Sequence, residues 1–403
     1  MWIWQQADWP KFHWNASSID ALLRQVYFNQ GQLLGKQMLS HDDSQLTSAA
    51  ALDTLLANII HSSAIEGEKL NAASVRSSLA KKLGVSEDKP YPTTAQTDGL
   101  ADIMLDALKN LETELTLERI LGWHKQLFPQ GYTLFNPVIG GAQRGDTPMQ
   151  VVSGRIDKPT VHFEAPSRAT LDAELSQFIE WFNASRQDLG LDPLIRAAIT
   201  HLWFVTLHPL DDGNGRITRL LTDLALAQAE KRSIRFYAMS VSILARRQAY
   251  YDILESTQRG DVDITPWLVW FFETLNDCLL NAMADVNKTL RKTQYWQNAD
   301  QSLLSQEQAK VLNRMLDGDF ELGMNSSQYQ KIAKVSRATA TRHLAQMVEQ
   351  GFLVKADAGG RSTRYLLPSG RKMDSAPIII LHFAFCILLV ITLCDLMPKS
   401  LCV

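Results

Sequence analysis

The stretch HPLDDGNGRITR, residues 208–219, gathers a histidine, two aspartates, two glycines and two arginines. Apolar helical sequences precede and follow it, so the segment is expected to be a tight loop that leads into a helix. A helix N-terminus presents free backbone N–H groups and the positive end of the helix dipole, which together bind anions. Gly213 and Gly215 would let this backbone approach a ligand closely. The pattern therefore predicts a phosphate-binding site.

The other side chains of this stretch suit the transfer of a nucleotide phosphoryl unit. Arg216 and Arg219 lie three residues apart, hence on one helix face, where their guanidinium groups could hold two phosphates. Asp212 is a hard oxygen ligand suited to Mg²⁺. His208 titrates near neutrality and can accept a proton from an attacking hydroxyl. A glycine turn with solvated charges is the ordinary alternative, and it is disfavoured because these charges would repel or desolvate one another without a ligand.

Helical spacing dominates the rest of the chain and indicates a mainly α fold, and the 403 residues suffice for two or three domains. Apolar residues recur at three- and four-residue spacing over 17–80, from about 95, and over 171–291. Between them, the runs MQVVSG and TVHFEAP predict two short strands joined by a turn. A compact helical bundle with one β-hairpin is expected. The expected units are residues 1–90, 95–291, 300–372 and 373–403.

The stretch resembles the signature of the Fic family, HPFx(D/E)GNGRxxR, with leucine at position 210 where phenylalanine is usual. The resemblance covers roughly residues 95–290 and places the hairpin where this family has a flap that binds the target protein. Members of the family commonly move AMP from ATP to a Ser, Thr or Tyr hydroxyl of a target protein. The resemblance thus implies a protein adenylyltransferase with ATP as co-substrate and Mg²⁺ as cofactor, although another nucleotide donor stays open.

The resemblance also implies a role for each position of the motif. His208 would be the general base and Asp212 the Mg²⁺ ligand. The flap around Val161–Phe163 would align the target by strand addition. Tyr250 and Tyr251 fall where the family often lines the adenine pocket, although ordinary core packing explains them equally well. The implied ATP-binding residues are Glu66, Val161, His162, Phe163, Gly213, Asn214, Gly215, Arg216, Ile217, Thr218, Arg219, Tyr250 and Tyr251.

Residues 57–70, ANIIHSSAIEGEKL, contain Ser62, Glu66 and Gly67. On a helix Ser62 and Glu66 lie one turn apart on the same face, and Gly67 suits a helix end. The segment resembles the family's inhibitory motif, (S/T)xxxE(G/N), which implies that Glu66 pairs with Arg219, occupies the place of the γ-phosphate and holds ATP in an unproductive pose. A solvated glutamate is the alternative for so short a pattern taken alone. Glu66 could also orient water for the removal of AMP, so a deadenylylating enzyme stays an alternative.

Residues 305–368 follow the order helix, helix, turn, helix and strand pair, which is the winged helix-turn-helix pattern. Between Ser326 and Lys372 nine basic side chains oppose two acidic ones, whereas the whole chain has a net charge of -3. This distribution suits contacts with DNA phosphates. Winged helices also dock proteins or form dimers, so DNA binding, a nucleotide-sensing DNA-binding regulator and a homodimer all stay open. The residues expected at the recognition helix and wing tip are Arg337, Thr339, Thr341, Arg342, Arg361 and Arg364.

The four cysteines form no CxxC pair and the N-terminus lacks a basic region before an apolar stretch, so a reducing cytoplasm is the expected location. Residues 378–394 carry no formal charge over seventeen positions, the short limit for a membrane helix. This tail is either a membrane anchor or sequence from a shifted reading frame or read-through. The second origin is favoured because the span is marginal and nothing else in the chain is adapted to a membrane. Membrane contact is expected only if the tail is genuine.

Overall fold

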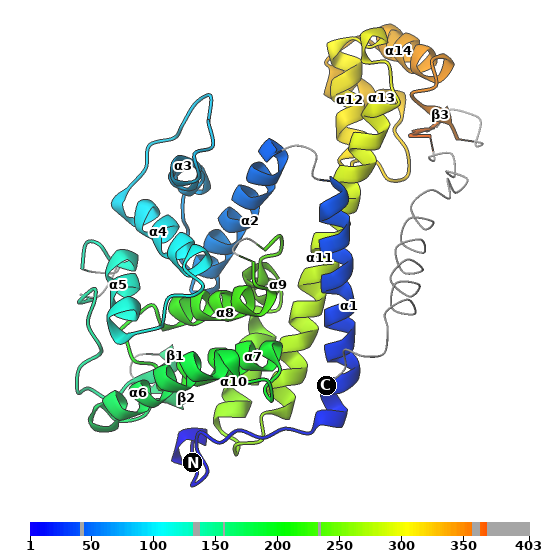
Figure 1. The fold of residues 1–403 in the computed structure, drawn as a ribbon. Coiled ribbons are helices and arrows are strands. Elements are labelled where there is room, and N and C mark those ends of the chain that lie inside the picture. Colours follow the sequence, from blue (N-terminus) through cyan, green and yellow to red (C-terminus); the bar gives the residue numbers. More distant parts are fainter. Residues whose placement is uncertain (41–43, 132–137, 156–157, 233–234, 357–362, 369–403) are drawn as a thin grey trace, which may run out of the picture. The chain divides into compact units, whose positions relative to one another are not determined.

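The computed structural model describes residues 1–40, 44–131, 138–155, 158–232, 235–356 and 363–368 (Figure 1). These residues are mostly helical, with two small antiparallel strand pairs. They divide into two compact units, Met1–Asn287 and Lys288–Val403. The prediction of a mainly α fold is confirmed.

The first unit begins with the short 3-10 helix η1 (Ile3–Gln5) and the helices α1 (Ala16–Ser40), α2 (Ser44–Ile65) and α3 (Ala72–Leu83). The three α-helices correspond to the stretch 17–80, where apolar spacing predicts helices, although α3 continues to Leu83. The short helix η1 lies before that stretch. Helix α2 buries an apolar stripe that includes Leu52, Leu55 and Ile59. After α2 the chain turns at Gly67, whose φ of 83° is a left-handed value that glycine adopts without strain. The end of α2 is therefore set where Glu66 and Gly67 predict it.

Helices α7 (Pro193–Leu207) and α8 (Asn214–Glu230) are central in the first unit (Figure 1). Every residue of α7 after its first, Pro193, is buried, and so are most residues of α8. The loop between these two helices is the stretch HPLDDG, so the predicted phosphate site lies at the junction of two buried elements. The helices that complete the unit are α4 (Ala95–Lys109), α5 (Leu117–Leu127), α6 (Arg168–Ala184), α9 (Met239–Ala245), α10 (Arg247–Gln258) and, as far as Asn287, α11 (Thr265–Gln297).

The predicted hairpin is present as β1 (Gln150–Arg155) and β2 (Lys158–Glu164), which pair antiparallel. Val152 pairs with Val161 and Val151 with Phe163, so His162 is an extra residue at a bulge. Residues on β2 contact α10, whereas β1 pairs only with β2 among the described strands. The strand β1 is therefore the outer strand of the hairpin.

Apolar spacing alone did not predict two features of the segment 171–291. The first feature is two further breaks in helical geometry. One follows α8, where Lys231 has a left-handed φ of 51°, and the other lies between α9 and α10 at Arg246. Helix α11 continues to Gln297 instead of ending near 291, and the division between the two units falls within it. Apolar spacing cannot reveal such a division because it reports burial and not what a helix is buried against.

The second unit contains the 3-10 helix η3 (Gln301–Leu303) and the helices α12 (Gln306–Leu316), α13 (Ser326–Ala333) and α14 (Arg337–Glu349). Two short strands, β3 (Val354–Lys355) and β4 (Tyr365–Leu366), pair antiparallel. The element order is the predicted one, and the winged-helix interpretation stays a prediction. The unit has its own apolar core, which includes Val311, Leu312, Tyr329, Leu344 and Met347.

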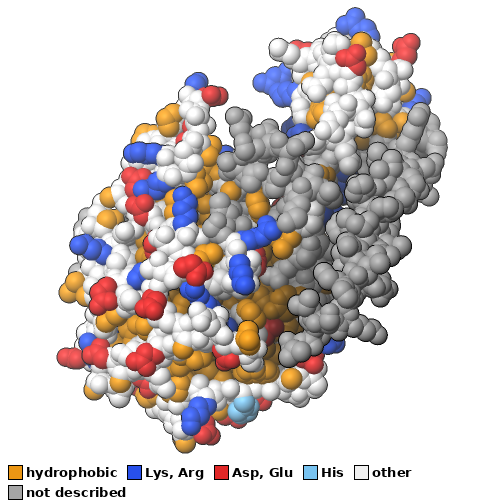
Figure 2. Space-filling view, in the orientation of Figure 1, with side chains coloured by type: hydrophobic (Ala, Val, Ile, Leu, Met, Phe, Trp, Pro, Cys, Tyr) orange, Lys and Arg blue, Asp and Glu red, His pale blue; other side chains and the backbone are white. Residues whose placement is uncertain are grey.

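Parts of the sequence-based interpretation lie outside the described residues, namely Arg361 and the apolar stretch 378–394. Among the helices that the structure does describe, none is long and apolar enough to cross a membrane. Figure 2 shows acidic and basic side chains interspersed over the visible face of the first unit. That pattern agrees with the small net charge of the chain.

Candidate active site

The loop between α7 and α8 brings the predicted site residues together at a helix N-terminus. Helix α8 begins at Asn214, and its N-cap residue Gly213 has a φ of 78°. A Cβ atom at Gly213 would come within 2.7 Å of Leu127 Cδ2 and 2.9 Å of Phe128 Cε2, so only glycine fits beside the end of α5. Because glycine has no side chain to cap the helix, the first N–H groups of α8 stay available to an anion.

Asn214 closes this loop with both polar atoms of its side chain. Its Nδ2 group donates to the Leu210 carbonyl at 2.7 Å, and the Leu210 N–H donates to its Oδ1 at 3.0 Å. Leu210, which stands where the signature usually has phenylalanine, is fully buried. The Asn214 side chain therefore holds the loop in shape. The neighbouring backbone N–H groups, and not this side chain, are the donors available to a phosphate.

His208 ends α7 in a left-handed conformation, with a φ of 49°. Its Nδ1 atom lies 3.2 Å from the Val205 carbonyl oxygen. A carbonyl can only accept a hydrogen bond, so Nδ1 carries the proton and Nε2 is the unprotonated nitrogen. Burial lowers the pKa of His208, and the hydrogen bond to the Val205 carbonyl and the Glu66 carboxylate only partly oppose this effect. The ring is therefore neutral near pH 7, with Nε2 ready to accept a proton.

Arg144 holds the His208 turn in place and was not singled out by the sequence. Its Nε group donates to the His208 carbonyl at 2.8 Å, and its backbone N–H donates to the Pro209 carbonyl at 3.0 Å. A third hydrogen bond runs from its guanidinium to the carbonyl of Pro166, just after β2. The residue is only 2% exposed. One buried guanidinium thus connects the histidine turn to the base of the hairpin.

Arg219 meets the two inhibitory-motif residues on α2 and just beyond its end. Its Nε group donates to Ser62 Oγ at 2.8 Å, and its Nη2 group donates to the Ser62 carbonyl at 2.9 Å and to Glu66 Oε1 at 2.7 Å. The Arg219 side chain is 3% exposed, and the Glu66 side chain is 32% exposed. The structure thus brings together residues that are 153 positions apart in the sequence.

The charges of this pair stabilise each other. Burial alone would raise the pKa of Glu66, but the ion pair and hydrogen bond with Arg219, together with the charges of Arg216 and His208, outweigh burial, so the pKa falls below its usual value. Burial would likewise lower the pKa of Arg219, but the Glu66 carboxylate raises it. Glu66 also presses against Gly215, where an added Cβ would lie 2.1 Å from its Oε1 atom. The carboxylate therefore occupies space next to the N-terminus of α8.

Arg216 points to a different carboxylate. Its Nη1 group donates to Glu68 Oε2 at 2.6 Å, and its guanidinium carbon lies 4.9 Å from the centre of the Phe128 ring. The next two residues of α8 direct their side chains inward, since Ile217 is fully buried and Thr218 donates to the Asn214 carbonyl at 2.7 Å. The side chain of Ile217 therefore packs in the core, and that of Thr218 bonds to the helix backbone, so neither side chain points to a ligand.

Of the two predicted adenine-pocket residues, Tyr250 lies in the core. It is 2% exposed, and its hydroxyl forms a hydrogen bond with His201 Nε2 at 2.9 Å. Tyr251 is partly buried and donates to the carbonyl of Ile65, the last residue of α2, at 3.1 Å. Tyr250 thus follows the core-packing alternative, whereas Tyr251 contacts the end of the inhibitory helix.

The second strand of the hairpin is fixed by its neighbours. Arg259, the residue just after α10, donates to the Val161 carbonyl at 2.7 Å, and Trp4 Nε1 donates to the Glu164 carbonyl at 2.7 Å. His162 lies between Glu255 at 2.7 Å and Ser153 at 2.6 Å. Phe163 is buried, with its ring centre 5.4 Å from that of Trp2. Two carbonyl groups of β2 are therefore already occupied, while the exposed valines Val151 and Val152 lie on β1.

Asp212 is the residue predicted to bind a metal ion. Its side chain is 44% exposed, its Oδ1 atom accepts from the Gly213 N–H, and Arg216 Nη2 lies 3.7 Å away. Within the described part of the chain, no group of three or more His, Cys, Asp or Glu side chains is placed to hold a metal ion by itself. One exposed carboxylate fits Mg²⁺, which commonly binds through one or two carboxylates together with substrate phosphates. The site thus suits an ion that arrives with a nucleotide.

Comparison with known proteins identifies the domain that carries this site. Residues 114–226 match the model of the Fic/DOC family. The chain contains a Fic/DOC family domain. A second model, described as a domain of unknown function (DUF4172), matches residues 2–85. The Fic/DOC match ends inside α8, and the other match includes α2, so Arg219 and Glu66 come from differently classified segments of the chain.

The Fic/DOC domain has curated relatives in insects. A Protein adenylyltransferase Fic of Culex quinquefasciatus is 31% identical over 216 residues, which are 53% of this chain and 39% of that protein. The protein of the same name in Aedes aegypti is 29% identical over 224 residues, 55% of this chain and 40% of that protein. The chain therefore matches only about two fifths of the length of these relatives.

The fold also resembles a solved structure. The crystal structure of a Fic family protein from Desulfovibrio desulfuricans G20 superposes with a TM-score of 0.51 and 18% identity. The match covers 89% of this chain and 98% of that one. At this identity the likeness supports the fold and says nothing of substrates.

Proposed function

We propose that this chain is a protein adenylyltransferase that transfers AMP from ATP to a Ser, Thr or Tyr hydroxyl of a target protein. One observation carries the proposal, namely that the unprotonated nitrogen of His208 belongs to the same tight loop as the uncapped N-terminus of α8. The names of the curated relatives support it. A general base beside an anion-binding helix terminus suits attack of a hydroxyl on a phosphate.

The reaction follows from the roles of these groups. The target hydroxyl oxygen attacks the α-phosphorus of ATP while His208 Nε2 accepts the hydroxyl proton. The bond between the α-phosphorus and the oxygen bridging to the β-phosphorus breaks, and diphosphate leaves with that electron pair. The N–H groups at the start of α8 would stabilise the charge on the α-phosphate, and Arg216 and Arg219 would hold the outer phosphates.

Asp212 would hold the Mg²⁺ ion that accompanies the nucleotide. When bound, the ion neutralises charge on the phosphates and on the leaving diphosphate. Asp212 itself keeps its carboxylate at the mouth of the loop, because its Oδ1 atom accepts from the Gly213 N–H.

We also propose that Glu66 keeps the enzyme inactive. In this proposal Arg219 would not hold the γ-phosphate while its Nε and Nη2 groups donate to Ser62 and Glu66. In the full chain with α-labelled ATP, the unchanged protein should label itself weakly and Glu66→Gly strongly, whereas Glu66→Gly with His208→Ala should not label. His343→Ala in the Glu66→Gly background is the matched control, because His343 belongs to the second unit and bonds to Tyr329. Equal labelling in every variant would contradict both the role of His208 as the general base and the role of Glu66 as the inhibitory residue.

The geometry of Glu66 also favours a second candidate activity, the removal of AMP from a modified target. Its carboxylate stays ionised beside Arg219 and lies next to the N-terminus of α8, where it could orient a water molecule. AMP release from an adenylylated target would then require Glu66. Release at the same rate from the Glu66→Gly protein would reject this activity.

The second unit supports a separate candidate function, contact with DNA. Arg337, Thr341 and Arg342 are exposed on the first turns of α14, and Lys334 is exposed just before it. Replacing Arg337 and Arg342 by Gln should weaken DNA binding and reduce the slope of log K against log salt by about one for each lost phosphate contact. His208→Ala should bind DNA unchanged. Binding that does not depend on salt would instead favour a protein partner or a second copy of the chain.

A further inference from the structure

A second polar contact joins α2 to α8 one turn beyond the pair of Ser62 and Arg219. Asn58 lies four residues before Ser62 on α2, and Asp223 lies four residues after Arg219 on α8. Asn58 Nδ2 donates to Asp223 Oδ2 at 2.6 Å. The two residues are 4% and 3% exposed. Because residues four apart share a helix face, this contact extends the line of contacts that contains Arg219.

Besides the ion pair between Glu66 and Arg219, the two segments share three contacts that follow each other at intervals of one helical turn. The order of the residues is reversed between them, so the helices run antiparallel where they touch. A shift of α2 by one turn, about 5.4 Å, would break all three contacts together. From the N-terminus of α8 inward, the contacts are Glu66 with Gly215, Ser62 with Arg219, and Asn58 with Asp223.

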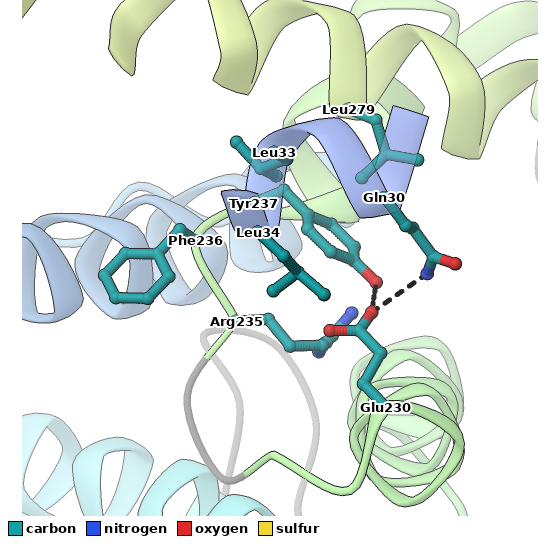
Figure 3. Close-up of a pocket in the computed structure, with 8 residues that line it drawn as sticks. All are labelled: Gln30, Leu33, Leu34, Glu230, Arg235, Phe236, Tyr237 and Leu279. Atoms are coloured by element: carbon teal, nitrogen blue, oxygen red, sulfur yellow. Dashed lines mark hydrogen bonds between the residues drawn. The ribbon is translucent and has the colours of Figure 1, made fainter. Parts of the chain in front are cut away.

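Asp223 is fixed from its other side. Its Oδ1 atom forms a close ion pair with Arg235, which is 4% exposed and lies 4.8 Å from the centre of the Tyr237 ring. Figure 3 shows Arg235 beside Glu230, which accepts hydrogen bonds from the Tyr237 hydroxyl and from Gln30 of α1. The carboxylate that receives Asn58 is thus anchored in the interior of the first unit.

A small cavity lies beside these contacts in the α2–α8 interface. Its volume is about 30 Å³, and it is lined by Asn58, Ser62, Arg219 and Asp223, together with apolar residues of α4 such as Leu100 and Met104. Apolar side chains leave this small space unfilled, so the polar contacts contribute to the register of the two helices beside ordinary packing. Each of them stabilises α2 only while it is paired, because a buried amide or carboxylate without a partner is unfavourable.

We propose that Asn58 and Asp223 are positioning residues that hold α2 in the register at which Glu66 reaches Arg219. The inference rests on the proposed function, because inhibition by Glu66 is what these residues would support. A buried hydrogen bond to a charged group shifts an equilibrium by roughly tenfold or more. Loss of this contact should therefore raise the fraction of molecules in which Arg219 is released, and activity should rise with that fraction.

The test uses the full chain with α-labelled ATP. Asn58→Leu keeps the size and the helix propensity of the position but removes the hydrogen bond. Self-labelling should rise about tenfold above the unchanged protein, towards the level of Glu66→Gly. Asp53→Asn is the matched control, because it removes an exposed pair between α2 and Arg76 of α3 that does not involve α8. The control should label like the unchanged protein.

A rescue experiment separates positioning from general destabilisation. Asn58→Asp sets two carboxylates against each other and should also raise labelling. Adding Asp223→Asn restores one amide and one carboxylate across the same interface but removes the carboxylate that pairs with Arg235, so labelling should return part of the way to the level of the unchanged protein. A merely structural role would lower the melting temperature without raising labelling, and the double variant would not bring labelling back.

The outcomes that overturn the inference differ from those that overturn the proposed function. If Glu66→Gly labels strongly while Asn58→Leu stays at the level of the unchanged protein, the positioning role is wrong. If Glu66→Gly does not label, the proposed function is wrong, and amide hydrogen exchange over residues 57–66 then tests the contact directly. Asn58→Leu must raise exchange there, and unchanged exchange overturns the inference.

Discussion

At the scale of single residues, the site depends on which groups hold protons and which hold charges. The sequence predicted His208, Arg216 and Arg219 because the chemistry of a tight loop is carried by residues that are neighbours in the chain. It did not predict Arg144, whose side chain contacts carbonyls 64 and 22 residues away. Every residue has a carbonyl, so such contacts leave no residue-type signal in the sequence.

The pH dependence of activity should report the environment of His208. Burial lowers its pKa below the ordinary value of 6.5, so the unprotonated base persists to lower pH than a free histidine would allow. In the Glu66→Gly protein the carboxylate that opposes this effect is absent, so the pKa should fall further. The acid limb of the kcat profile is therefore expected below pH 6.5. An acid limb at or above that value would mean that His208 is not the base or is not buried during turnover.

Arg144 should act through the position of His208. Arg144→Met in the Glu66→Gly background removes both guanidinium hydrogen bonds, and a shift of about 1 Å at a catalytic group can cost about 100-fold. We expect kcat to fall by that order with little change in the KM for ATP. Arg168→Met is the matched control, because this arginine is paired with the exposed Asp172. A rise in KM with unchanged kcat would instead place Arg144 in nucleotide binding.

At the scale of elements, the sequence pattern predicted the helices and the hairpin, but not the contacts that depend on how these elements pack together. The period of apolar residues predicted most helices and the β-hairpin because burial of one face is a local property. The left-handed turn at Lys231 and the contacts that fix β2 were not predictable in this way. Trp4 reaches the Glu164 carbonyl across 160 residues, and Arg259 reaches the Val161 carbonyl across 98 residues. Such contacts depend on how the elements pack.

The junction of α5, the loop and α8 should tolerate no side chain at Gly213. Gly213→Ala would require a left-handed alanine, which costs about 1–2 kcal/mol, and its Cβ would also collide with Leu127 and Phe128. We expect a lower melting temperature together with loss of labelling in the Glu66→Gly background. Gly145→Ala is the matched control, since no atom lies within 4 Å of its added Cβ and its φ is not positive. Equal behaviour of the two variants would show that the loop can move away from α5.

At the scale of the whole molecule, the chain combines two units with separate cores. The sequence already separated them by charge, because the basic residues after Ser326 contrast with the acidic chain as a whole. The inhibitory contact, in contrast, lies inside the first unit, between two helices of the same core. Nucleotide binding should therefore affect the stability of the first unit and not that of the second.

Calorimetry of the full chain can test this separation. A non-hydrolysable ATP analogue with Mg²⁺ should raise the melting temperature of the first unit. At a hundred times its Kd, the analogue should raise the free energy of unfolding of that unit by about 2.7 kcal/mol. The increase should be larger in Glu66→Gly than in the unchanged protein at equal concentration, because Arg219 is then free to bind phosphate. Leu312→Ala identifies the other transition, since it removes a fully buried side chain from the core of the second unit and should cost about 2–5 kcal/mol there. A nucleotide-dependent shift of that second transition would show that the units are coupled and that inhibition by Glu66 involves more of the chain than α2 and α8.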